Sequence, residues 1–194
     1  MIKKLSLFLF AALLSGKAIA QTELSLNVSN LLINEANVTL EKGLSDNFSL
    51  VGFASYVYGF PPTDNMEFIN TNFYFGPEVR YYVSPVNGID RFFIGVYLKE
   101  AIGNISQNDQ YYYFYDPSQF RNQSSSYSKL AFGLSLGAKW VTRSNVLFGL
   151  NMGFGRNIYT EFSNENFRDY YFNSNGFNEY YDFRIGFNLG YRFN

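Results

Sequence analysis

The stretch from Tyr180 to Phe193 constrains the fold of this chain more than any other part of the sequence. Apolar or aromatic residues occupy every second position there, and charged residues, asparagine or glycine lie between them. Because successive side chains of a strand point to opposite faces, one face is apolar and the other is polar. Soluble strands run about five or six residues, whereas a tilted strand needs roughly nine to eleven to cross a bilayer. The length of this stretch therefore predicts a membrane-crossing strand with lipid on its aromatic side.

The N-terminal residues predict that the chain is exported. Two lysines, an apolar run that ends at Leu14, and the sequence Ala-Ile-Ala ending at Ala20 are typical of a cleaved secretory signal peptide. The apolar run is about ten residues, against the roughly twenty that a spanning helix needs. We therefore expect residues 1–20 to be removed and residues 21–194 to form one domain.

Composition excludes several classes of function. The chain has no His and no Cys, so it lacks the commonest general base and metal ligand and cannot build a Ser/His or Cys/His nucleophile. Without the three lysines of the signal peptide, the 15 basic residues become 12 against 16 acidic ones, a net charge of -4. That weak acidity gives no basic surface for nucleic acid. We expect no enzymatic activity, no metal and no cofactor.

Aromatic residues make up 21% of the chain and charged residues only 16%, below the roughly 25% charged residues of an average soluble domain. No window after residue 20 approaches twenty consecutive apolar residues, which excludes spanning helices. An exported, aromatic-rich chain can then enter a membrane only as a closed β-barrel, because lipid cannot satisfy an open sheet edge.

Alternating patterns predict an all-β, eight-stranded antiparallel up-and-down transmembrane β-barrel. The expected strands cover 24–29, 37–41, 48–58, 70–83, 91–99, 129–140, 146–155 and 180–193. Connections after the second, fourth and sixth strands are short, and those after the third, fifth and seventh are longer, which places both termini in the periplasm. Pro77 predicts a bulge, because proline removes a ladder donor. The alternation of 48–58 is too irregular to assign its faces.

The inward faces combine small residues with charged ones. An eight-stranded barrel has room inside only for side chains or one small ligand, and an isolated buried charge costs many kcal/mol, so we expect paired charges. The predicted lumen network consists of Glu41, Glu78, Arg80, Lys99, Lys139, Asp182, Arg184 and Arg192. This network either fills the barrel or lines a narrow path for water or a solute. An acid–base pair of Glu78 with Glu41 is a third interpretation.

Two long polar segments, 104–126 and 157–179, are rich in Tyr and Asn. Their aromatic residues either pack the loops at the outer headgroup belt or serve as rigid anchors for an extracellular partner. The candidate contact residues are Tyr111, Tyr112, Tyr113, Tyr115, Tyr170 and Tyr171.

With its signal peptide, alternating strands, short-turn and long-loop rhythm, and closing Gly190-Tyr191-Arg192-Phe193, the chain resembles the small outer-membrane barrels typified by the outer membrane protein A transmembrane domain. The resemblance covers essentially all of 21–194. It implies that Tyr191 and Phe193 belong to the signal read by the barrel-assembly machinery. Barrel enzymes of the outer membrane generally use a catalytic His, which this chain lacks.

These observations predict a monomeric, non-enzymatic barrel in contact with the lipid of a bacterial outer membrane. In the leading hypothesis it is a closed structural barrel that displays its long loops. One alternative is a narrow, porin-like channel for water, ions or a small solute. Another is a soluble secreted lipocalin-like binder, in which the faces are reversed.

Overall fold

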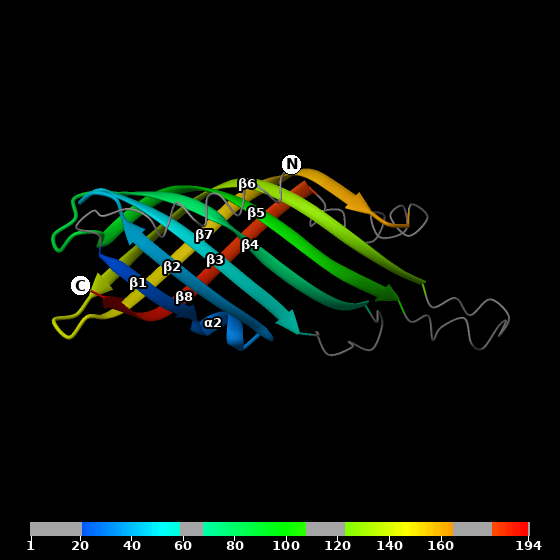
Figure 1. The fold of residues 1–194 in the computed structure, drawn as a ribbon, viewed down its shortest axis with the longest axis horizontal. Helices are drawn as coiled ribbons and strands as arrows, with labels where there is room; N and C mark the ends of the chain where they lie inside the picture. Colours follow the sequence, from blue (N-terminus) through cyan, green and yellow to red (C-terminus); the bar gives the residue numbers. More distant parts are fainter. Residues whose placement is uncertain (1–20, 59–67, 108–122, 165–179, 194) are drawn as a thin grey trace, which may run out of the picture.

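A computed structural model describes residues 21–58, 68–107, 123–164 and 180–193. In chain order the strands are β1 (Thr22–Asn27), β2 (Glu35–Gly43), β3 (Phe48–Tyr58), β4 (Phe68–Tyr82), β5 (Arg91–Gln107), β6 (Gln123–Val141), β7 (Val146–Phe162) and β8 (Tyr181–Phe193). Each strand pairs antiparallel with its neighbours in the sequence, and β1 pairs with β8, so the sheet closes into a barrel (Figure 1). The predicted all-β, eight-stranded antiparallel up-and-down barrel is confirmed.

Three strands continue well beyond their predicted ends. The ladder between β5 and β6 runs on to Gln107 and Gln123, and β7 reaches Phe162. Residues 104–107, 123–126 and 157–162 were predicted as loop, which is wrong. Their Ser, Asn and Gln residues carry no apolar alternation, but an antiparallel ladder can continue on backbone hydrogen bonds alone. The remaining parts of both predicted loops lie outside the described residues.

The first connection is a short helix, α2 (Val28–Leu31), and not a continuation of β1. Asn27 is its N-cap, and the Asn27 side chain accepts a hydrogen bond of 3.2 Å from the backbone N–H of Asn30. Asparagine is among the preferred N-cap residues. The predicted strand 24–29 is therefore two residues too long, because alternation cannot show where a cap ends a strand.

Pro77 does not produce the predicted bulge. The β4–β5 register is the same on both sides of it, Phe75 pairing with Glu100 and Glu78 with Tyr97. The proline, which has no N–H to donate, lies where the ladder is interrupted. The register shift in this sheet lies instead between β6 and β7, at Leu130/Ala131.

The structure assigns the two faces of β3, which the sequence pattern left open. Val51, Phe53 and Val57 are buried inside it, and Phe48 and Tyr56 are exposed on its outer surface. Alternation was irregular in this strand because large apolar residues occupy both faces.

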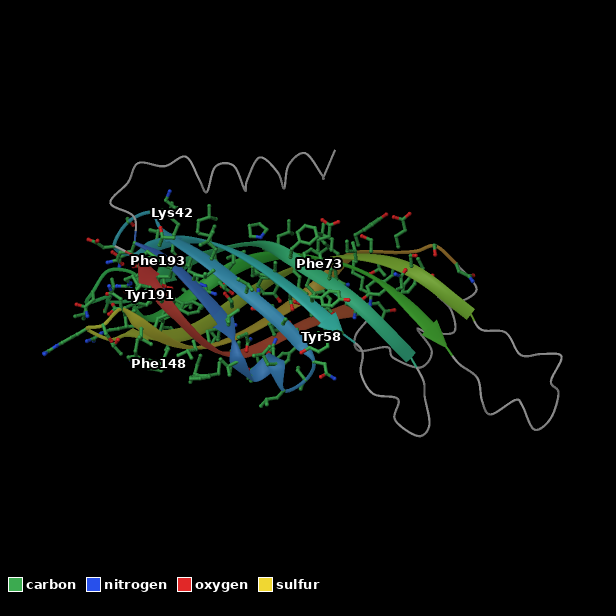
Figure 2. The ribbon with its side chains drawn as sticks, turned by 60° about the horizontal axis from the view of Figure 1, so that its bottom comes forward. Lys42, Tyr58, Phe73, Phe148, Tyr191 and Phe193 are labelled. Carbon is green, nitrogen blue, oxygen red and sulfur yellow. The ribbon has the colours of Figure 1, made fainter. Side chains whose placement is uncertain are left out.

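The outer surface of the barrel is apolar and aromatic, while its interior is largely polar and charged (Figure 2). The exposed apolar side chains include Leu26, Val38, Val79, Ile94, Leu134, Leu150 and Ile185. Among the described residues, no helix has the length and hydropathy needed to cross a membrane.

Replacing Gly137 by alanine is expected to lower the free energy of unfolding by about 1–3 kcal/mol, the usual cost of overpacking. An added Cβ would lie 2.3 Å from the carbonyl oxygen of Leu150 and 2.6 Å from the Phe93 ring. Gly149→Ala is the matched control, because the nearest atom, the carbonyl oxygen of Ala138, would lie 3.7 Å away. Urea unfolding followed by the fluorescence of the single tryptophan, Trp140, measures both variants. Equal losses would contradict the packing described.

Candidate functional site

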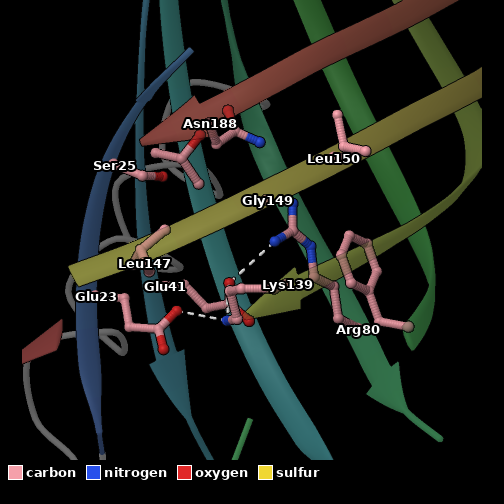
Figure 3. Close-up of a pocket in the computed structure, with 11 residues that line it drawn as sticks. Glu23, Ser25, Glu41, Arg80, Lys139, Leu147, Gly149, Leu150 and Asn188 are labelled. Atoms are coloured by element: carbon pink, nitrogen blue, oxygen red, sulfur yellow. Dashed lines mark hydrogen bonds and ion pairs between the residues drawn. The ribbon is translucent and has the colours of Figure 1, made fainter. Parts of the chain in front are cut away.

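The barrel interior is built around the carboxylate of Glu41 on β2. It accepts hydrogen bonds from Arg80 Nη1 at 2.9 Å and from Lys139 Nζ at 3.0 Å. It also accepts from Ser49 Oγ at 2.6 Å and from Tyr82 OH at 2.5 Å. Figure 3 shows Glu41, Arg80 and Lys139 meeting from different strands inside the barrel. A buried carboxylate with two cations and two hydroxyls has its hydrogen-bonding capacity filled.

Glu23 on β1 is a member of this cluster that the sequence analysis missed. Its carboxylate pairs with Lys139 Nζ on one side and accepts a hydrogen bond of 2.7 Å from Arg192 Nε on the other. The side chain is fully enclosed. The sequence could have predicted this position. Leu24 and Leu26 face outward, so Glu23, which precedes Leu24 on the same strand, must face inward.

Glu78 on β4 extends the cluster toward β6 and β8. It accepts hydrogen bonds of 2.7 Å from Arg80 Nε and from Ser135 Oγ, and a longer one of 3.4 Å from Arg184 Nη1. Gly95 leaves the space that this carboxylate occupies, since a Cβ there would lie 3.1 Å from Glu78 Oε1. Arg80 therefore bridges Glu78 and Glu41, so the two acids do not form an acid–base pair free of cations.

A separate pair joins β5 to β8. Asp182 accepts hydrogen bonds of 2.5 Å from Lys99 Nζ and 2.7 Å from Tyr97 OH. Aromatic rings further support the cations, with Arg80 at 4.3 Å from the centre of the Phe93 ring and Arg184 at 4.1 Å from that of Phe53. Such cation–π contacts strengthen where water is excluded.

The structure places all the predicted lumen residues inside the barrel. Six of them connect through Glu23 and the shared carboxylates into one chain of ion pairs, and the other two form the separate pair. The connected residues are Glu41, Glu78, Arg80, Lys139, Arg184 and Arg192, and the separate pair is Lys99 with Asp182. We call this set, together with Glu23, the lumen network.

The turn between β4 and β5 covers the end of the barrel that carries the C-terminus. Its residue Ile89 is buried and packs with Tyr82 and Phe93. Arg192 ties this turn to β8, donating from Nη1 to the carbonyl of Asn87 at 2.5 Å and from Nη2 to that of Ile89 at 3.2 Å. The turn therefore acts as a plug below the lumen network.

Arg80 lines two cavities inside the barrel. The smaller, about 20 Å³, is lined by Glu23, Glu41 and Lys139 and has little more room than a single water needs. The larger, about 280 Å³, is lined by Lys99, Arg184 and other residues of the outer half of the barrel. Arg80 lines both cavities together with Thr39 and Asn188, so the two cavities adjoin at this level of the lumen.

The other predicted site residues lie elsewhere. Tyr191 and Phe193 are exposed on the outer surface with ring centres 5.2 Å apart, at the end where the C-terminus lies (Figure 2). The predicted loop tyrosines, Tyr111 through Tyr115 and Tyr170 with Tyr171, lie outside the described residues. Within the described ranges, no group of three or more acidic side chains is arranged to hold a metal ion.

These features define a class of protein: a closed, eight-stranded antiparallel barrel with an apolar outer surface and a plugged, ion-paired interior. The chain belongs to the family described as "Protein of unknown function (DUF3575)", whose family profile matches residues 5–193. No curated protein and no solved structure matches the chain.

Replacing Glu41 by glutamine is expected to cost about 3–5 kcal/mol of unfolding free energy, because it leaves Arg80 and Lys139 without a shared counter-charge. Glu35→Gln removes the same charge where the bonded partner is one neutral hydroxyl, that of Ser55, and should cost about 1 kcal/mol or less. Urea unfolding of both variants gives the comparison. A loss at Glu41 no larger than that at Glu35 would show that the lumen network does not hold the barrel together.

Proposed function

We propose that this protein is a non-enzymatic β-barrel of a bacterial outer membrane, closed to solutes, whose outer end displays the long connections to the exterior. The observation that carries the proposal is the inversion of the usual arrangement of side chains. Charged residues fill the inside of the barrel, and large apolar residues cover its outside. Monomeric soluble proteins rarely expose such large contiguous apolar surfaces.

The outward residues are ordered along the strands as a bilayer requires. On β6, Phe132 and Trp140 flank Leu134 and Leu136, and on β7 Phe148 and Phe154 likewise flank Leu150 and Met152. Eight residue steps separate Phe132 from Trp140, which at about 3.4 Å per residue and a tilt of about 40° span about 21 Å. Outer-membrane barrels carry an apolar band about 25 Å tall between two aromatic girdles.

Charged residues on the outer face lie at the borders of this band. Lys42 lies near the end with the short turns, and Arg156 follows Phe154 toward the other end. On β5 the outward Glu100 pairs with Leu130 of β6, one outward position beyond Phe132. A soluble lipocalin-like binder would reverse both faces, so this distribution counts against that alternative.

A closed structural role is favoured over a channel by the contents of the lumen. The lumen network leaves a cavity of only about 20 Å³ beside Glu41 and Lys139, and the plug residue Ile89 covers the end below it. Rings of charge can line a pore only if ions can pass between them, whereas Glu41 and its partners lie within hydrogen-bond distance of one another.

Display of the long connections is supported by the strands that carry them. β5, β6 and β7 continue beyond the aromatic row that contains Phe132 and Phe154, and β6 is hydrogen-bonded to the residues that follow β7. Ser126 N–H donates to Ser163 Oγ at 3.0 Å, and Asn164 N–H donates to Ser125 Oγ at 3.2 Å. The strands therefore present the connections on a firm base, where an extracellular partner can reach them.

Biogenesis follows from the same proposal. Tyr191 and Phe193 lie on the outer surface of the last strand, where the barrel-assembly machinery can read them before the strand pairs with β1. This proposal extends the resemblance to the outer membrane protein A barrels. Every strand of the closed barrel pairs with a neighbour on both sides, which leaves no free edge strand for association, in keeping with a monomer.

Leu134→Arg is expected to cost about 2–4 kcal/mol of folding free energy in lipid vesicles, the value for arginine near the bilayer midplane. Leu44→Arg makes the same change in the exposed β2–β3 turn and should stay within about 0.5 kcal/mol of the wild type. Reversible unfolding in urea with vesicles present measures both. Equal effects of the two substitutions would contradict a lipid-facing Leu134.

In a planar bilayer the refolded mature chain is expected to be electrically silent, because the lumen network blocks the barrel. A heat-dependent gel shift serves as the control that the barrel is folded. Discrete conductance steps that change with Glu78→Gln would overturn the closed-barrel proposal and favour the channel.

A further inference from the structure

At β1 the barrel wall is shorter along the strand direction than at its neighbours β2 and β8. β1 pairs with β8 only from Thr22 opposite Phe193 to Asn27 opposite Asn188, yet β8 continues to Tyr181. On its other side β1 pairs with β2 only as far as Val38, while β2 begins at Glu35. In the outer half of the barrel, β8 and β2 therefore have no strand between them in the described part of the chain.

Helix α2 lies at this break in the wall (Figure 1). It packs against β8 and β2, and Ser29 Oγ accepts a hydrogen bond of 3.0 Å from the backbone N–H of Phe187. A four-residue helix cannot supply the ladder that a strand would give to the rest of β8. Its neighbouring apolar side chains, Leu31 and Ile33, are exposed on the outer surface.

The larger cavity reaches the outer surface at the same place. Its lining includes inward-facing residues such as Phe53, Lys99 and Arg184. It also includes Ile33 and Ile185, which are 51% and 60% exposed on the outer, apolar face. Ile185 lies on the part of β8 that has no β1 partner, and Asn30 of α2 also lines the cavity, so the cavity extends to the break in the wall between α2 and β8. We call this opening the side portal.

The charged lining of the cavity favours an anion. Arg80, Lys99 and Arg184 line it with a single acid, Glu35, and the carboxylates that neutralise the bases lie behind the lining. Glu35 itself is engaged by the hydroxyl of Ser55.

Among the described residues, the Arg184 guanidinium has N–H donors that bind no protein acceptor. Within the described residues its one hydrogen bond to protein runs from Nη1 to Glu78 at 3.4 Å, the longest ion pair of the lumen network. Its guanidinium carbon lies over the rings of Phe53 and Tyr97, at 4.1 Å and 4.7 Å from the ring centres. A guanidinium carries five N–H donors, and a carboxylate or phosphate can take two of them at once.

We propose that the side portal admits a single-chain anionic amphiphile from the outer leaflet, with its carboxylate or phosphate head bound by Arg184 and its tail leaving the barrel between Ile33 and Ile185. This inference rests on the proposed membrane location. The cavity of about 280 Å³ lies just below the usual range of ligand pockets, about 300–1,000 Å³. It therefore accommodates a head group and the first part of a chain, while the rest of the chain stays in lipid.

The test uses the mature chain in phosphatidylcholine vesicles at alkaline pH, with stearate carrying a nitroxide near its carboxyl end. The expected result is an immobilised component in the electron paramagnetic resonance spectrum. Stearate labelled near its methyl end should retain a lipid-like spectrum, and the neutral methyl ester of the first probe should give no such component. Dodecanoate or dodecyl phosphate should compete, which separates a carboxylate from a phosphate preference, while acetate and inorganic phosphate should not compete.

Variants assign the site. Arg184→Gln should weaken binding at least tenfold, as expected for the loss of a charge-assisted pair. Arg143→Gln, which makes the same change in the exposed β6–β7 turn, should bind as the wild type. Ile33→Glu leaves Arg184 in place and should also weaken binding, because it puts a negative charge at the side portal.

Equal immobilisation of the stearate and its methyl ester would indicate general contact with the barrel surface and would overturn the inference. Unchanged binding by Arg184→Gln would do the same. Failure of the wild-type chain to insert into vesicles would instead contradict the proposed function.

Discussion

The pairing of charges inside the barrel is the constraint on which the rest of the structure depends. Closing eight strands gives each strand a hydrogen-bonded neighbour on both sides, but it also forces the inward side chains into a narrow space. Removing one partner from such a buried pair is strongly destabilising, because the remaining charge is left without compensation. Glu41 and Glu23 meet this demand by sharing Lys139 between them, and Arg80 links them to Glu78. Glycines on the inward faces, such as Gly95 and Gly137, provide the room for these long side chains.

The same constraint divides the barrel into two unequal halves. Where β1 is present, the lumen network and Ile89 leave almost no free space. Where β1 gives way to α2, the network ends at Arg184, and a larger cavity opens toward the outer surface. A wall of uniform height would seal this cavity, so one short strand gives the barrel both its closed section and its side portal. Structural closure and lateral ligand binding are therefore compatible in one small barrel.

Alternation predicted the fold because one face of each strand is consistently apolar, as in β8. It could not show that β5, β6 and β7 continue where both faces become polar, nor that Asn27 caps a helix, because neither feature has a period. Inward placement of the charged residues followed from the same alternation. Their pairing did not, since Lys139 meets Glu23 across 116 residues of sequence and only the register of the closed sheet brings them together. Glu23 was missed because it precedes the first apolar residue of its strand, and the cavity was missed because it depends on where β1 ends.

The most direct test of the account is the environment of the outward face. The chain has no cysteine, so a nitroxide can be attached to a single introduced cysteine at Leu134, at Leu150 or, as a reference, at Leu44 in the turn. Collision with oxygen, which concentrates in lipid, is compared with collision with a water-soluble nickel complex after refolding in vesicles. The account predicts that oxygen dominates at Leu134 and Leu150 and that nickel dominates at Leu44. Nickel dominating at all three positions would place the apolar belt in water and contradict the membrane barrel.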